Sequence, residues 1–197
     1  MALAVEHEKR RKKILERALD VFMDDGFENA TFQKIADKSG ITRTILYLYF
    51  KNKREIFNFS IKQFLVNAEE KLNEIRSNDK INSIEKITKI LSAVFKLLDH
   101  NRKLLSVVLD YLLHTTKDEF NPDERVRRRT LKLRRIISSV LIEGVKAGEI
   151  KNVNIKEAND YLYSYVESAI FQLAVLKRKE IKELEKTTLF AVKQLVV

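Results

Sequence analysis

Apolar residues recur at helical spacing along almost the whole chain of 197 residues. Ile14, Ala18 and Phe22 form one such stripe, because residues three and four apart lie on the same face of a helix, and they predict a helix over 8–25. Similar stripes predict further helices over about 53–76, 84–98, 102–115, 122–146, 156–177 and 181–196. We find no pattern typical of a strand, so the sequence predicts an all-α fold of about nine helices.

Two shorter helices are predicted between the first and the fourth. Thr31 is suited to cap one of them, Gly40 to end it, and Thr42 to cap the next. Such short helices bury little surface alone and need their neighbours as cover. Helix, tight turn and helix over 31–50 are typical of a three-helix helix-turn-helix unit. We therefore expect an N-terminal DNA-binding domain over 1–52 and a larger helical domain over 53–197.

The last of these short helices carries an unusual polar face. Its apolar side is formed by Ile45, Leu46, Tyr49 and Phe50, and its polar side by Arg43, Thr44, Tyr47, Leu48 and Lys51. Arginine reads guanine edges, and threonine or leucine methyls meet the thymine methyl in the major groove. Tyrosine hydroxyls and lysine suit phosphates. The alternative interpretation is a charged exposed helix whose aromatic residues serve only as core.

The charge of the chain is strongly basic, at +10, which favours a polyanionic partner. Residues 29–54 hold six cations against one anion. A second run, Arg125–Arg135, holds seven cations and no anion. We interpret the second run as a solvated helix face with bridges to acids; the alternatives are an anionic ligand, membrane headgroups or a second nucleic-acid contact.

The sequence lacks the residues that several classes of function require. The absence of cysteine excludes disulfides, thiolate metal sites and cysteine nucleophiles. None of His7, His100 and His114 has a metal-ligand partner at helical spacing, and no Gly-rich phosphate loop occurs. We expect no enzyme, no metal and no cofactor. The N-terminus is too short for a signal-peptide core, and no apolar run approaches the roughly 18 residues of a membrane span, so we expect a cytoplasmic protein without membrane contact.

One segment has a specific likeness. Lys12 to Phe57 reads KKILERALDVFMDDGFENATFQKIADKSGITRTILYLYFKNKREIF, and it resembles the N-terminal domain of the TetR family of bacterial transcriptional regulators. The positions that carry the resemblance are Ile14, Leu15, Ala18, Phe22, Gly26, Thr31, Ile35, Ala36, Ser39, Gly40, Ile41, Thr42, Leu46, Tyr47, Tyr49, Phe50 and Lys53. Thr44 and Leu48 depart from the family pattern, where a small residue and a polar or aromatic residue are usual.

The resemblance implies a role for each position of this segment. Arg43 and Thr44 would read bases, and Leu48 would meet a thymine methyl or a sugar. The remaining contacts, to phosphates and the groove edge, would come from Thr31, Gln33, Thr42, Tyr47, Tyr49 and Lys53. The cluster Lys9–Lys13 could contact the flanking backbone, or it is simply a solvated helix start.

The helix over 156–177 is apolar on nearly all sides, which is typical of a helix buried on both faces. With the helix over 181–196 it could form a four-helix interface between two copies related by two-fold symmetry. The alternative is burial within one chain. The residues expected at the dimer interface are Leu162, Val166, Ile170, Leu173, Leu184, Thr188, Val192 and Leu195.

The resemblance further implies a ligand-responsive repressor. It would bind a near-palindromic double-stranded DNA operator as a homodimer, and a small effector of apolar or aromatic character would release it by shifting the fourth helix. The effector pocket could be lined by Phe57, Phe64, Phe95, Tyr111, His114, Tyr161, Tyr165 and Phe171, although each such residue is more often ordinary core. The alternative function is a DNA-binding regulator or recruitment protein without an inducer.

Overall fold

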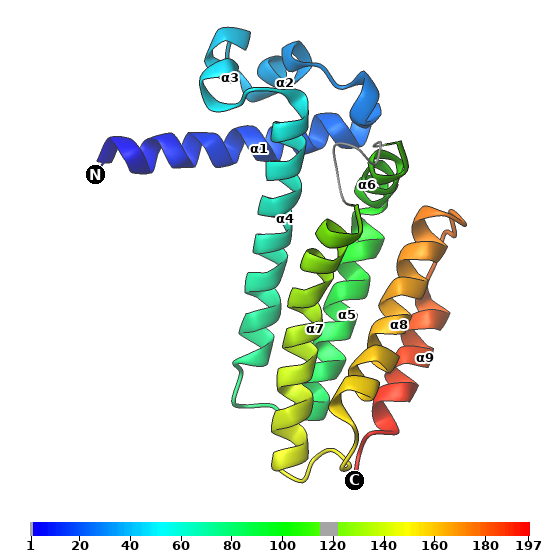
Figure 1. Cartoon of the computed structure of the whole chain (residues 1–197). Helices are drawn as coiled ribbons and strands as arrows, with labels where there is room; N and C mark the ends of the chain where they lie inside the picture. Colours follow the sequence, from blue (N-terminus) through cyan, green and yellow to red (C-terminus); the bar gives the residue numbers. More distant parts are fainter. Residues whose placement is uncertain (1, 115–121) are drawn as a thin grey trace. The chain divides into compact units, whose positions relative to one another are not determined.

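The computed structural model describes the backbone of residues 2–114 and 122–197 and the side chains of 5–113 and 131–197. In these ranges the regular structure is α-helix throughout, apart from one isolated bridge between Ile150 and Val196. The all-α prediction is therefore confirmed. The helices are α1 (Ala2–Asn29), α2 (Phe32–Ser39), α3 (Arg43–Tyr49), α4 (Lys53–Arg76), α5 (Ser83–His100), α6 (Arg102–His114), α7 (Pro122–Lys146), α8 (Ile155–Ala174) and α9 (Lys182–Lys193) (Figure 1).

The chain forms two compact units. The first contains residues up to 67 together with 107–113, so it holds α1, α2, α3, the start of α4 and the end of α6. The second contains the rest of the described chain. α4 contributes its first part to one unit and its last part to the other, so the two units do not correspond to the two expected domains one for one. The domain boundary expected at residue 52 stays a prediction.

The core of the first unit is built from the stripes that the sequence predicts. Its largest fully buried side chains are Phe22, Phe50, Phe57, Ile14, Ile35, Leu46 and Ile56. The hydroxyl of Ser60 in α4 donates to the carbonyl of Leu15 in α1 at 2.9 Å, which satisfies a polar group inside this core. These contacts fix α1 against α4 and provide the support on which α2 and α3 pack.

The first helix differs from its prediction at both ends. It begins at Ala2 rather than at residue 8, and it continues past Gly26 to Asn29 with a break at the glycine. Gly26 has φ 77° and ψ 172°, so it is not the left-handed cap that the sequence favours. The turn after the break carries Phe27, whose ring lies 5.1 Å from that of Phe57, so this turn packs on the aromatic core of the unit.

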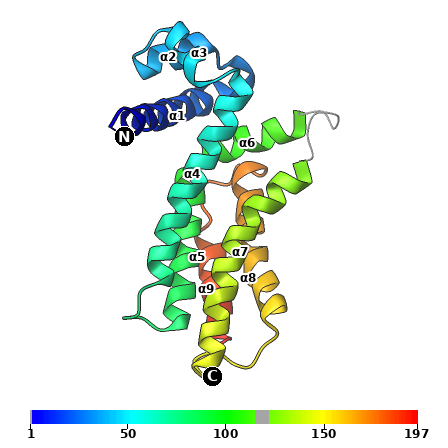
Figure 2. The same ribbon diagram turned by 60° about the vertical axis from the view of Figure 1, so that its left-hand side comes forward.

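In the second unit α5, α7, α8 and α9 lie side by side, as Figure 1 and Figure 2 show from two directions. Their common core includes Phe95, Leu91, Ile137 and Leu162. α8 ends at Ala174, three residues earlier than predicted. In the segment that follows α8, the carbonyl of Arg178 accepts from Arg102 at 2.9 Å.

The predicted dimer residues lie inside this core rather than on its surface. Leu162, Thr188 and Val192 are completely buried within a single chain. Val166, Leu173 and Leu195 are buried, and Ile170 and Leu184 are partly buried against the same cluster. These side chains pack within their own unit, as in the alternative of burial within one chain, and their place at a dimer interface stays a prediction.

The aromatic residues expected around an effector are distributed over both units. Phe95 is buried in the core of the second unit, whereas Tyr111 packs in the first unit. Tyr161 and Phe171 are about half exposed, at 50% and 52%. Phe64 and Tyr165 are partly buried, and the side chain of His114 lies outside the described residues. That these residues line an effector pocket stays a prediction.

The second basic run can be followed only in part, because the side chains of 125–130 lie outside the described residues. Lys132 pairs with Glu69, and Arg134 pairs with Asp160 and lies 4.0 Å from the ring of Tyr163. The interpretation of a solvated face with bridges to acids is confirmed for these two cations. Among the described residues, no helix is both long and apolar enough to cross a bilayer.

Candidate nucleic-acid interface

The turn between α2 and α3 is fixed by three local capping contacts. Thr31 Oγ1 accepts from the backbone N–H of Lys34 at 3.2 Å, and Thr42 Oγ1 accepts from that of Ile45 at 3.2 Å. Gly40 takes up the left-handed conformation, with φ 67° and ψ 34°, where a side chain would be strained. The predicted caps at all three positions are confirmed, and they fix the local turn between α2 and α3.

Burial separates the two sides of α3. Leu46 and, just after the helix, Phe50 are fully buried, and Tyr49 is half-buried. On the opposite side Arg43 and Thr44 are exposed, and Leu48 is 76% exposed. The side chain of Leu48 therefore does not pack in the core of its own unit.

The exposed arginine of α3 is held in place by a stack of aromatic groups. Arg43 Nη2 donates to the hydroxyl of Tyr47 at 3.0 Å, and its guanidinium carbon lies 5.5 Å from the centre of that ring. The ring of Tyr47 stacks in turn on Phe32 of α2, with centroids 4.6 Å apart and planes at 21°. Residues of both short helices therefore restrict the guanidinium to the exposed face.

Polar residues around this face are partly engaged within the chain. Gln33 Nε2 donates to Asp37 Oδ1 at 2.8 Å. Lys53 Nζ donates to the carbonyl of Glu28 at 2.8 Å and lies 4.6 Å from the ring of Phe27. Lys53, expected to hold a phosphate, thus ties the end of α1 to the start of α4 in this structure.

Two residues absent from the predicted contact set lie beside it. Lys51 is exposed directly after α3, and its place on the polar side of the helix is the signal that could have included it. His7 of α1 stacks on Tyr49 with ring centroids 4.6 Å apart and planes at 21°. No sequence pattern predicts that contact, because the two residues lie far apart in the chain.

Known proteins share both the segment and the fold. Residues 14–58 match the model of the bacterial regulatory proteins of the tetR family. The HTH-type transcriptional regulator YfiR of Bacillus subtilis is 30% identical over 150 residues, which are 75% of this chain and 72% of that protein. The fatty acid metabolism regulator protein of Bacillus subtilis is 28% identical over 172 residues, covering 83% of this chain and 84% of the relative.

Solved structures agree with this match along the full chain. A TetR transcription regulator from Haloarcula marismortui superposes with a TM-score of 0.82 at 14% identity, over 96% of this chain and 100% of that one. The regulator FadR from Bacillus subtilis, solved in complex with stearoyl-CoA, gives 0.72 at 22% identity over 93% and 96%. At these identities the likeness concerns the fold alone. The family comes from the match of residues 14–58 and the extent of the YfiR match: the chain belongs to the TetR family of bacterial transcriptional regulators, which are DNA-binding proteins rather than enzymes.

Proposed function

We propose that this regulator binds a near-palindromic operator as a homodimer, with α3 of each copy in the major groove, and represses transcription until an effector releases it. The observation that carries the proposal is the exposed Arg43 held by Tyr47 on Phe32. A guanidinium fixed before binding loses less side-chain entropy when it meets a guanine edge.

The remaining residues of the interface divide by chemistry. The methyl groups of Thr44 and Leu48 suit a thymine methyl, since both side chains are exposed beside Arg43. Hydroxyl, amide and ammonium groups contact phosphates and the groove edge, and such contacts fix the register of the protein on the duplex without reading its sequence. We assign that role to Thr31, Gln33, Thr42, Tyr47, Tyr49 and Lys51, with Lys53 acting mainly as a tie within the chain.

For dimerisation, we propose the outer face of α8 and α9. Tyr161, Phe171 and Val175 are exposed on α8 and at its end, and Phe190 is 64% exposed on α9. On α8 these residues alternate with Ser164 and Ser168 at spacings of three and four, the repeat of helices that pack closely on one another. Leu162 and Leu173 occupy the opposite, buried side of the same helix. Two copies of such a face would form an isologous four-helix contact.

As the effector we propose a long-chain acyl-CoA. The support is the similarity to the Bacillus subtilis fatty acid metabolism regulator, together with the stearoyl-CoA complex of FadR from the same organism. An acyl chain would need apolar side chains, which the second unit is rich in, and the CoA phosphates would need cations, which the Arg125–Arg135 run of the sequence contains. Release requires that the acyl-CoA bind one conformation more tightly and DNA the other.

The test is selection of bound duplexes from a random pool, followed by titration of the selected duplex with stearoyl-CoA. We expect a near-palindrome whose half-sites lie about 34–36 Å apart, and loss of binding with stearoyl-CoA but not with CoA alone. Failure to enrich any sequence would refute the proposed function. Enrichment with no response to acyl-CoA would refute the effector and favour the alternative regulator without an inducer of this class.

A further inference from the structure

We propose that the N-terminal part of α1, residues 5–13, is a second DNA-contacting element that binds phosphates flanking the stretch read by α3. The proposal rests on the DNA binding proposed above and extends it to a surface outside the helix-turn-helix. Its occupant is the sugar-phosphate backbone of the same duplex rather than a separate partner.

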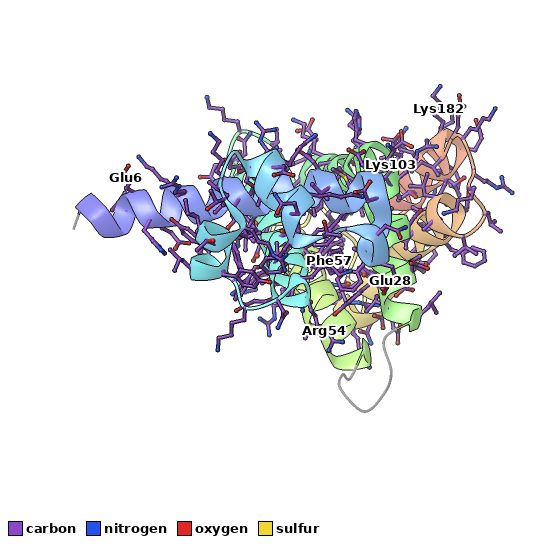
Figure 3. The ribbon with its side chains drawn as sticks, turned by 90° about the horizontal axis from the view of Figure 1, so that it is seen from above. Glu6, Glu28, Arg54, Phe57, Lys103 and Lys182 are labelled. Atoms are coloured by element: carbon purple, nitrogen blue, oxygen red, sulfur yellow. The ribbon has the colours of Figure 1, made fainter. Side chains whose placement is uncertain are left out.

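The first observation is that this part of the helix has little cover from its own chain. Residues 5–10 are exposed, as are Lys12 and Lys13 one turn later. Figure 1 shows α1 extending beyond α2, α3 and α4, and Figure 3 labels Glu6 on the extended portion. The helix therefore continues well past the residues that its own core requires, which begin at Ile14.

The second observation is how this extension is fastened. His7 stacks on Tyr49 at the end of α3, and the guanidinium of Arg11 lies 4.3 Å from the ring of Phe59 and 5.3 Å from that of Phe50. His7 and Arg11 prolong the buried stripe of Ile14 and Ala18, since all four lie on one face of the helix. The stripe thus holds the extension beside the end of the recognition helix and leaves its other sides free.

The third observation is the charge on those other sides. Residues 9–13 are five consecutive cations, of which Arg11 pairs with Glu8 at 3.6 Å. Within the described part of the chain, no carboxylate pairs with Lys9, Arg10, Lys12 or Lys13. Four unpaired cations therefore occupy about 6 Å of helix axis, within about two turns of a residue that touches α3.

Duplex DNA matches this arrangement. It presents one negative charge per about 1.7 Å of its axis, so cations beside the end of α3 lie close to further phosphates once α3 enters the groove. A membrane surface is a poor match, because such helices need an apolar face and Val5 is the only apolar side chain in 5–13. The chemistry of the extension therefore favours flanking phosphates and adds affinity without reading bases.

The test compares two variants of equal charge change. In the first, Lys9, Arg10, Lys12 and Lys13 are replaced by glutamine. In the control, four exposed lysines of the second unit are replaced by glutamine: Lys71, Lys80, Lys89 and Lys146. Affinity for the duplex recovered by selection is measured across salt concentrations, with the bare operator and with the operator extended at both ends.

We expect the first variant to show no preference for the extended duplex. The slope of the logarithm of its binding constant against the logarithm of salt concentration should be flatter, by about 0.9 for each phosphate that the protein no longer neutralises. Its base preference should stay that of the wild type, and the control should keep the wild-type slope. His7→Ala keeps every cation and should still weaken the preference for the extended duplex. This second variant tests the proposal if the fourfold variant folds poorly.

Equal slopes for the two fourfold variants, with wild-type binding intact, would overturn this inference alone. A wild-type protein that binds no duplex would instead overturn the proposed function. Loss of binding to phosphatidylglycerol vesicles in the first variant, with an unchanged DNA slope, would also overturn the inference and point to a membrane surface.

Discussion

The ring of Tyr111 in α6 lies 4.5 Å from the ring of Phe27 at the end of α1, centroid to centroid. Both also pack on Phe57 of α4, at 4.7 Å and 5.1 Å, and the ring of Phe57 lies 4.9 Å from that of Phe22 (Figure 3 labels Phe57). Tilted and edge-on aromatic pairs at these distances stabilise the fold by more than the burial of their apolar area alone. The second half of α6 is therefore part of the core of the N-terminal unit.

Tyr111→Ala should destabilise this unit strongly. The side chain is 6% exposed, and truncation of a buried aromatic leaves a cavity that costs about 3–5 kcal/mol of unfolding free energy. Leu113→Ala on the same helix is the matched control: it is 82% exposed, so we expect a change within about 0.5 kcal/mol. Urea denaturation of the two variants measures the difference, and similar losses of stability would contradict the packing role of Tyr111.

Gly26→Ala should also destabilise, for a purely conformational reason. A Cβ built at this position meets no atom within 4 Å, but φ 77° with ψ 172° is a region that residues with side chains avoid, at a cost of about 1–3 kcal/mol. Gly40→Asn provides the contrast, because its φ 67° and ψ 34° are left-handed helical values that asparagine tolerates. Thermal unfolding should rank Gly26→Ala below Gly40→Asn; the reverse order would contradict the strain argument.

Local contacts explain why part of the fold follows from sequence. Thr31, Gly40 and Thr42 act within three or four residues of themselves, so turn and cap chemistry predicts both the helix-turn-helix and the exposed side of α3. The ends of α4 and α7 likewise match their predicted bounds, since Arg76 and Lys146 lie just before breaks in the apolar pattern.

Long-range packing explains what the sequence does not predict. On α8 the apolar residues run nearly all round, and only the placement of α5, α7 and α9 decides that Leu162 is buried while Phe171 is exposed. Tyr111 is an aromatic residue of a helix assigned to the effector domain, yet its partners are Phe27 and Phe57, which lie far away in sequence. Hydrophobic periodicity identifies an apolar face but not what covers it.

Replacing residues of the Arg43 stack should change base preference more than overall affinity. Arg43→Ala should remove discrimination at one base pair, worth about 1–3 kcal/mol, because alanine cannot make the bidentate hydrogen bonds to guanine. Phe32→Ala leaves Arg43 in place but removes the surface on which Tyr47 stacks, so we expect a smaller effect at the same base pair. Competition between the selected operator and its single-base variants measures both; a Phe32→Ala effect spread evenly over all positions would contradict the positioning role.

Phe171→Glu should convert the protein into a monomer. A carboxylate in the centre of an isologous apolar contact would be buried in two copies at once, and a buried unpaired charge is strongly unfavourable. Ile142→Glu is the control, since Ile142 is 42% exposed on α7, outside the proposed face. Sedimentation equilibrium should give a monomer for Phe171→Glu and a dimer for Ile142→Glu. A dimeric Phe171→Glu protein would contradict the assigned interface.

The turn after α7 is tied to the start of α5 by an ionised carboxylate. The backbone N–H of Ser83 donates to Glu149 Oε2 at 2.8 Å, and hydrogen bonding to Ser83 lowers the pKa of Glu149, with a further contribution from the positive charge of Lys86. Lys86 is 2% exposed and donates to Glu143 Oε1 at 2.6 Å, so its charge is fixed at this place. The ionised form of Glu149 therefore stabilises the folded protein better than the protonated form does.

The pKa of Glu149 is lower in the folded than in the unfolded protein. As the pH falls towards these pKa values, the unfolded state therefore binds more protons than the folded state. The stabilisation is fully present above the ordinary value of 4.5 and disappears as the pH falls through the lowered value of the folded state. Glu149→Gln should thus lower the unfolding free energy at neutral pH, and its deficit relative to wild type should shrink progressively below about pH 4.5. Glu74→Gln, at an exposed position of α4, should show no such deficit. Urea denaturation over this pH range is the measurement, and a Glu149→Gln deficit that persisted unchanged into acid would mean that the carboxylate charge does not stabilise the turn.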